Sequence, residues 1–133
     1  MPSGFHHITL NVRDLDRARH FYGEILALPA DQDFPGEKLR YRVPGTDTRL
    51  VLKPPLPGTP DGDRFSEHRI GLDHIALGVA SREELEHLVE TLDTHHVEHS
   101  GVHHDRMGPA MVTFRDPDNY QWEYFEDVSQ SNQ

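Results

Sequence analysis

Two short segments of the chain, 67 residues apart, show the same alternation of polar and apolar residues. Residues 7–12 read HITLNV and residues 74–79 read HIALGV, and in both segments the second, fourth and sixth positions are apolar. A period of two residues is typical of a half-buried β-strand. Recurrence at a fixed offset indicates an internal duplication, so the pattern predicts a chain of two similar halves.

A helical pattern follows each of these strands. In the first half, Asp14 is a candidate N-cap for a helix that runs to about Leu28, with apolar residues three and four positions apart. In the second half, Ser81 to Glu84 forms a Ser-x-x-Glu capping box, and apolar residues follow at helical spacing. The helices are therefore expected to repeat as well.

The ends of the two halves align at an offset of 73, which places residues 41–52 over residues 114–125. Pro44 and Pro117 then fall at equivalent turns between two strand-like runs. The larger offset indicates an insertion of six residues in the second half, which we expect in a loop from 100 to 109. Each half thus reads as one strand, one helix and about three strands, an α+β arrangement of two tandem βαβββ modules.

The boundaries of the modules follow from composition. We expect one domain in which module one covers about residues 5–53 and module two about residues 70–126. Residues 54–69 between them contain four prolines and two glycines and are typical of a linker. Residues 127–133 form a polar tail.

Composition and charge exclude several classes of protein. The chain of 133 residues has no apolar run long enough to span a bilayer, no export signal and no cysteine, so we expect a cytoplasmic protein without disulfides or thiolate metal ligands. Its formal net charge of −10 disfavours nucleic acid as a partner. Eleven histidines are an unusual excess for this length, and histidine is the commonest protein ligand for metals.

Three residues form a candidate metal site. If the halves pair with quasi-two-fold symmetry, their first strands lie side by side and His7 and His74 converge. In the closing strand the bulky Trp122 is expected under the helix, so that Glu123 points the other way. Two imidazoles and one carboxylate form a facial triad, which suits one divalent ion, Fe(II) or Mn(II) first and Zn, Ni or Co as further options.

The segments HHITLNVRDLDRARHFYGEILALP, GLDHIALGV and FRDPDNYQWEYF resemble the vicinal oxygen chelate superfamily. This superfamily includes glyoxalase I, extradiol dioxygenases, fosfomycin-resistance transferases, methylmalonyl-CoA epimerase and bleomycin-resistance proteins. The resemblance covers about residues 5–126 and implies an open, cupped mixed sheet with flanking helices. It also implies that His7, His74 and Glu123 hold the metal. Asn119 and Tyr120 depart from the usual Gly and Asn of the closing turn.

Other departures from the superfamily's motifs reduce the number of activities that we expect for this chain. The fourth ligand position aligns with Leu50, which argues against glyoxalase I and epimerase chemistry because leucine neither binds a metal nor moves a proton. A histidine of the extradiol dioxygenases falls near His104, but their catalytic tyrosine aligns with Thr113. The phosphate-binding Lys and Tyr of the fosfomycin transferases fall on His103 and Thr113.

Two functions remain open at this stage. The first is a metal-dependent enzyme that chelates a small substrate through adjacent oxygens, with dioxygenase-like or lyase-like chemistry. In it His104 is the candidate base, Arg40 the candidate clamp for an anionic oxygen, and the substrate-binding candidates are Thr9, Asn11, Leu50, Met111, Thr113 and Gln121. The alternative is a non-enzymatic protein of the bleomycin-resistance type that sequesters an antibiotic or other aromatic natural product in a dimer cleft. Either way we expect a homodimer with a small-molecule ligand.

Overall fold

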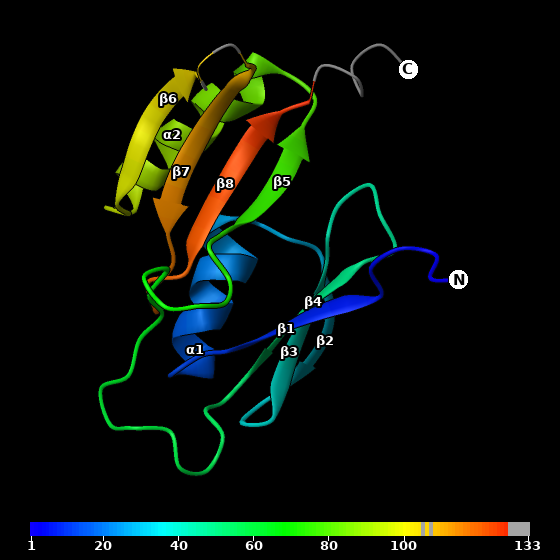
Figure 1. Ribbon diagram of the computed structural model, residues 1–133, viewed down its shortest axis with the longest axis vertical. Helices are drawn as coiled ribbons and strands as arrows, with labels where there is room; N and C mark the ends of the chain where they lie inside the picture. Colours follow the sequence, from blue (N-terminus) through cyan, green and yellow to red (C-terminus); the bar gives the residue numbers. More distant parts are fainter. Residues whose placement is uncertain (105, 107, 128–133) are drawn as a thin grey trace. The chain divides into compact units, whose positions relative to one another are not determined.

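The computed structural model describes residues 1–104, 106 and 108–127 (Figure 1). The contacts within the chain divide it into two compact units, Met1–Asp63 and Arg64–Gln133, and each unit is described by itself. Residues 128–133 of the expected polar tail lie outside the described part. No helix in the described part is long and apolar enough to cross a membrane.

The first unit contains one mixed sheet and one helical segment. Its elements in chain order are β1 (His7–Asn11), α1 (Leu15–Ala18), a π-helical continuation (Arg19–Ile25), β2 (Ala30–Phe34), β3 (Lys38–Arg42) and β4 (Arg49–Lys53). The strand order is β1-β4-β3-β2, with β1 parallel to β4 and the other pairs antiparallel. Asp14 caps the helix as predicted, because its carboxylate accepts hydrogen bonds from the backbone N–H groups of Asp16 and Arg17.

The second unit repeats this topology. Its elements are β5 (Ile75–Val79), α2 (Arg82–Thr94), β6 (His99–His104), β7 (Ala110–Arg115) and β8 (Gln121–Glu126), and its strand order is β5-β8-β7-β6. The Ser81 hydroxyl accepts from the backbone N–H of Glu84, while the Glu84 carboxylate accepts from the N–H of Ala80, one residue before the expected capping partner. The α+β fold of two βαβββ modules is confirmed.

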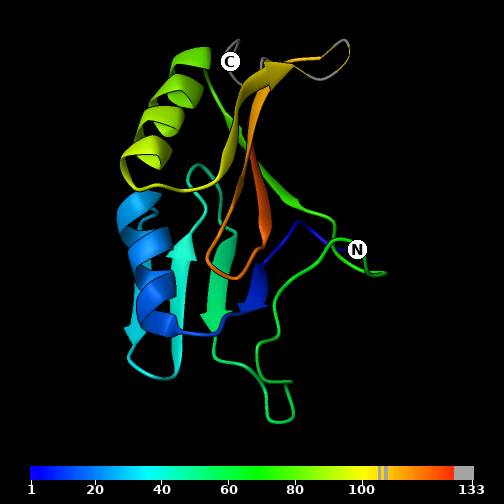
Figure 2. The same cartoon turned by 90° about the vertical axis from the view of Figure 1, so that its left-hand side faces the viewer.

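Each helix covers one face of its own sheet, and the core of each unit lies between them (Figure 2). The first core contains buried apolar side chains from the helix and the facing strand positions: Leu10, Val12, Leu15, Phe21, Tyr22, Leu39, Tyr41, Leu50 and Leu52. The second core contains Leu85, Leu88, Leu92, Val112, Phe114 and Trp122. The alternation along the strands leaves mainly polar side chains on the opposite face of each sheet, together with the buried Val51 in the first unit and Met111 in the second.

Two boundaries differ from the sequence-based expectation. Residues 100–104 belong to strand β6 instead of the loop that we expected from 100 to 109. The strand contains a bulge between His99 and Val102, and Gly101 within it has a φ of 70° that a residue without a Cβ adopts easily. Residues 64–69, the last part of the expected linker, belong to the second unit.

Candidate metal centre

The register of the second sheet decides which side chains share a face with Glu123. Glu123 pairs with Ala76 on one side and with Thr113 on the other. Its neighbour Trp122 is 2% exposed and packs on the opposite face, under α2. Glu123 therefore points away from the core, and Met111, Thr113 and Gln121 lie on the same face.

His74 directly precedes β5, and its imidazole lies beside the Glu123 carboxylate. The Nε2 atom of His74 is 3.4 Å from Oε1 of Glu123, and the two side chains are 37% and 16% exposed. A separation of 3.4 Å is long for a direct hydrogen bond. Two ligands that each lie about 2.1 Å from one ion are roughly 3.0 Å apart at a right angle and roughly 3.4 Å apart at a tetrahedral angle, so the observed separation is close to both. The pair thus fits two positions of a metal site.

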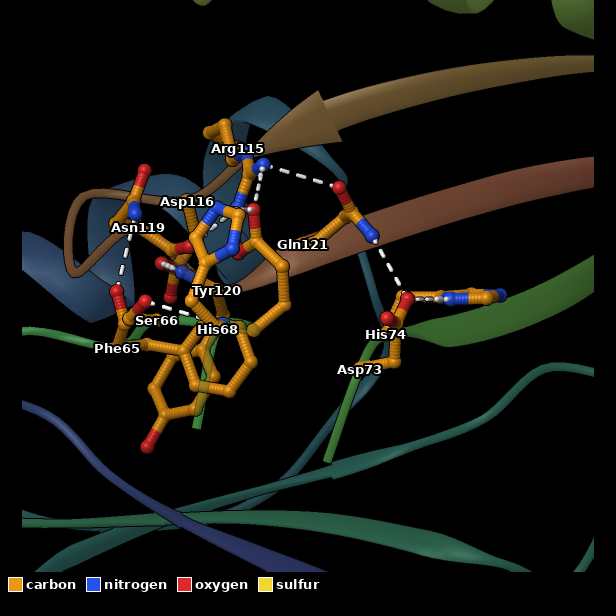
Figure 3. A network of polar contacts seen from close by, with 11 residues as sticks. Phe65, Ser66, His68, Asp73, His74, Arg115, Asp116, Asn119, Tyr120 and Gln121 are labelled. Carbon is orange, nitrogen blue, oxygen red and sulfur yellow. Dashed lines mark hydrogen bonds and ion pairs between the residues drawn. The ribbon is translucent and has the colours of Figure 1, made fainter. Parts of the chain in front are cut away.

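A carboxylate holds the other ring nitrogen of His74 (Figure 3). The Nδ1–H group of His74 donates to Oδ1 of Asp73 at 2.6 Å, and Gln121 Nε2 donates to the same oxygen at 3.2 Å. Since a carboxylate only accepts, this contact fixes the proton on Nδ1 and leaves the Nε2 lone pair for a ligand. Asp73 is not among the site residues predicted from the sequence, although it directly precedes His74.

The hydrogen-bond network continues from Gln121 through Arg115 to a second carboxylate, that of Glu67. Arg115 Nη2 donates to Gln121 Oε1 at 3.0 Å, and the guanidinium forms two 2.9 Å hydrogen bonds with the Glu67 carboxylate. The Arg115 side chain lowers the pKa of Glu67 to about 2, and Glu67 in turn raises the pKa of Arg115. Both amide ends of Gln121 are occupied, so this residue positions Asp73.

The segment before His74 is anchored to the turn between β7 and β8. The ring of Phe65 stacks on Tyr120 with centroids 4.8 Å apart, and Asn119 Nδ2 donates to the carbonyl of Phe65 at 3.0 Å. Asn119 itself has a φ of 71°, a left-handed conformation that asparagine tolerates better than most residues. Asn119 therefore adopts a conformation that glycine also adopts easily.

His7 is the first residue of β1 in the other unit and pairs in register with Arg49. Its Nδ1 atom is 2.8 Å from Nδ1 of His6, so one ring donates and the other accepts. If His7 is the donor, its Nε2 lone pair is available to a metal, as in His74. Across the described residues, no group of three His, Asp or Glu side chains forms a complete metal site. The expected site takes ligands from both units, so the role of His7 as a ligand stays a prediction.

The predicted alignment of Leu50 with Glu123 is wrong by one residue, because Val51 is the equivalent position. Leu50 pairs with Ile8 and is 2% exposed, so its side chain lies in the core, away from the face that carries His7. Val51 pairs with Thr9 as Glu123 pairs with Ala76, and Val51 therefore holds the place equivalent to Glu123. Because valine is also no ligand, the first module offers no fourth carboxylate at this position. Leu50 cannot contact a substrate on that face.

The expectation for His104 as a base is also wrong. His104 pairs with Ala110 on the face that α2 covers, and its Nε2 atom lies 3.4 Å from Nη1 of Arg82 at the start of that helix. His103 pairs with Met111 and shares the face of Glu123 instead. Its Nε2 atom is 3.4 Å from the hydroxyl of Thr113.

Arg40 lies on the face of the first sheet that carries His7, but its guanidinium is engaged. Arg40 Nε donates to Asp31 Oδ2 at 2.5 Å, and Arg49 Nε donates to the same oxygen at 3.0 Å. These hydrogen bonds, with Arg40 first, lower the pKa of Asp31. Thr9 shares this face, as does Asn11, whose amide donates to the carbonyl of Pro54 at 3.2 Å.

Known structures share this fold. A glyoxylase/bleomycin resistance protein/dioxygenase domain from Frankia sp. EAN1pec is 28% identical, with a TM-score of 0.79 over 95% of this chain and 98% of that one. A lactoylglutathione lyase from Agrobacterium tumefaciens is 21% identical, with a TM-score of 0.72 over 95% of both chains. The fosfomycin resistance protein FosX from Listeria monocytogenes is 22% identical, with a TM-score of 0.73 over the full length of both chains.

No curated protein gives a significant match. The family model of the glyoxalase/bleomycin resistance protein/dioxygenase superfamily matches residues 4–124. That range includes His7, His74 and Glu123 and all of the two βαβββ modules except the last two residues of β8. The chain belongs to the glyoxalase/bleomycin resistance protein/dioxygenase superfamily.

Proposed function

We propose that the protein is a metal-dependent enzyme that binds a small molecule through two adjacent oxygens. The observation that carries this proposal is the 3.4 Å approach of His74 Nε2 to the Glu123 carboxylate, with Asp73 on the other ring nitrogen. A buried structural histidine needs no such pairing of a carboxylate on each nitrogen, whereas metal-binding histidines commonly have a second carboxylate behind them.

The third ligand in this proposal is His7, from the other module. Both β1 and β5 are edge strands of their sheets, so the two strands can be paired without displacing a neighbour. In this proposal His7 would complete the ligand set of His74 and Glu123, with the modules paired either within one chain or between the chains of a homodimer. Two imidazoles and one carboxylate suit Fe(II) or Mn(II), and a FosX variant is known in complex with Mn(II). The bound ion supplies Lewis acidity to the chelated oxygens.

The remaining residues of the face bind and orient the substrate. Thr113 lies directly across from Glu123 and offers a hydroxyl, and Met111 forms an apolar floor beside it. His103, next to Thr113, is the histidine placed to hold a proton during dioxygenase-like or lyase-like chemistry. Gln121 keeps Asp73, and through it His74, in place.

A chelator experiment separates this enzyme from the alternative, a sequestering protein of the bleomycin-resistance type. Purified protein is tested against a panel of catechols, α-hydroxy ketones and aromatic antibiotics, before and after removal of metal. The enzyme predicts turnover of one compound class that stops without metal and returns when Fe(II) or Mn(II) is added. Tight binding of a compound that is unchanged by metal removal, with no turnover, contradicts the proposal and supports sequestration.

A further inference from the structure

The open face of the first sheet carries an unusual concentration of positive charge. His7, Thr9 and Asn11 of β1 share this face with alternate residues of β3 and β4. The positively charged residues among them are Lys38, Arg40, Arg42, Arg49 and Lys53. These five residues are part of only 13 lysines and arginines in a chain whose net charge is −10. The opposite face of the same strands is apolar core.

One carboxylate in the strands of this sheet compensates that charge. Asp31 accepts from both Arg40 and Arg49, while Asp33 pairs with Arg19 of the helical segment, on the core side of the sheet. Asp31 thus neutralises one of the five cations and fixes two guanidinium groups in place. A surplus of four positive charges remains on this face, with His counted as neutral.

The arrangement costs stability that an anion can restore. Arg42 pairs directly with Arg49, and like charges in directly opposed positions destabilise a sheet. Arg42 and Lys53 are exposed and have no carboxylate partner within the described part of the chain. An oxyanion bound beside Arg42 and Arg49 would receive charge-assisted hydrogen bonds and relieve the repulsion between them, and Lys53 four residues along β4 would add to the positive potential of the face.

We propose that this face is the binding surface for an oxyanion group, a carboxylate or a phosphonate, on the substrate. Arg42, Arg49 and His7 lie in one row across β3, β4 and β1. Neighbouring strands are about 4.8 Å apart. The anionic group of the substrate would therefore lie roughly 5–10 Å from its chelating oxygens, which lie near His7. The substrate class is therefore a small acid whose negatively charged group is separated by a few bonds from its chelating oxygens. The assignment rests on the proposed function for the identity of those oxygens, but the anion surface belongs to one unit.

A titration of the metal-free protein tests this surface independently of the metal. Propylphosphonate, propionate and uncharged propane-1,2-diol are titrated at low ionic strength and followed by NMR, after stripping metal and removing the chelator. We expect the two anions to shift signals of β3 and β4, and the diol to leave them unchanged. The double variant Arg42→Gln with Lys53→Gln should raise the Kd for the anions about tenfold or more. The relative affinities of the two anions then select between carboxylate and phosphonate.

The control variant, Arg69→Gln with Arg82→Gln, removes the same charge outside this sheet and should retain the original Kd. Equal weakening in both double variants, or no preference for the anions over the diol, would overturn the assignment. Metal uptake is measured on the same samples and should be the same in all of them. Anion binding without metal uptake would retain the surface and reject the metal-dependent function.

Discussion

Val51 in β4 occupies the place in the first module that Glu123 in β8 occupies in the second. Val51 pairs with Thr9, two residues after His7, and Glu123 pairs with Ala76, two residues after His74. The duplicated modules therefore differ at the position of the proposed carboxylate ligand. One module offers a histidine and a carboxylate, and the other offers a histidine alone.

This register predicts losses of stability of different size for two neighbouring substitutions. Leu50→Glu places a charge in the core and should lower the free energy of unfolding by several kcal/mol, about 3 or more. Val51→Glu places the same charge on the other face of the sheet, where Val51 is 7% exposed and lies across from Arg40, and should cost less than Leu50→Glu because the guanidinium can pair with it. Urea unfolding followed by circular dichroism measures both. A greater loss in Val51→Glu than in Leu50→Glu would contradict the register.

Asp73 should control the affinity of the metal without contacting it. Asp73→Ala removes the acceptor of the His74 Nδ1–H group, and loss of such a partner typically weakens metal binding by about 10–100-fold. Competition with a chromophoric chelator measures the dissociation constant. Asp61→Ala, in an exposed part of the linker, is the matched control, and an equal affinity in both variants would remove Asp73 from the site.

The Glu67–Arg115 pair makes stability depend on pH in a defined direction. The pKa of Glu67 is about 2 in the folded protein against an ordinary 4.5, so the folded state favours the charged form. The pair therefore stabilises the protein fully above pH 4.5, and the contribution is lost as the pH falls from there toward 2. The difference in free energy of unfolding between wild type and Glu67→Gln should be largest near pH 7 and smaller at pH 3.

Urea unfolding at these two pH values makes the comparison, with Glu86→Gln on the exposed side of α2 as the control. A difference between wild type and Glu67→Gln that grows as the pH falls would contradict the ion pair. The control variant should show little dependence on pH relative to wild type.

The two adjacent histidines of β6 should respond differently to a paramagnetic metal. His103 shares the face of Glu123, and His104 lies on the face that α2 covers. Mn(II) broadens the NMR signals of nearby nuclei much more than those of distant ones. In a titration, the imidazole signals of His103 should broaden before those of His104. The reverse order, with assignments made from His103→Gln and His104→Gln, would return His104 to the site.

The sequence was sufficient to predict the modules and the facing of the closing strand. Alternation separated Glu123 from Trp122, and the duplication located His7 and His74 at equivalent places. The assignment of Leu50 failed because the turn from 43 to 48 is one residue longer than the turn from 116 to 120. An alignment anchored at the prolines within these turns shifts every residue of β4 by one, which moves its side chain to the other face.

His104 and Asp73 could not be assigned by alternation for different reasons. The segment from 99 to 104 has little apolar character, and the bulge at Gly101 shifts the residues that face each side. The role of Asp73 depends on the anchoring of Phe65 and Glu67 to the β7–β8 turn, which is a contact between residues about 50 positions apart. Such contacts leave no periodic signal in a single sequence.

Metal stoichiometry tests the central claim most directly. The protein is purified without chelator under anaerobic conditions, dialysed, and analysed for Fe, Mn, Zn, Ni and Co as wild type and as His7→Ala, His74→Ala and Glu123→Gln. His87→Ala, an exposed histidine of α2, is the control for adventitious binding by the other histidines. The proposed centre predicts about one ion per chain in wild type and control, and a loss in each of the three ligand variants with the fold retained. A full complement of metal in His74→Ala, or none in wild type after Fe(II) and Mn(II) are supplied, would contradict it.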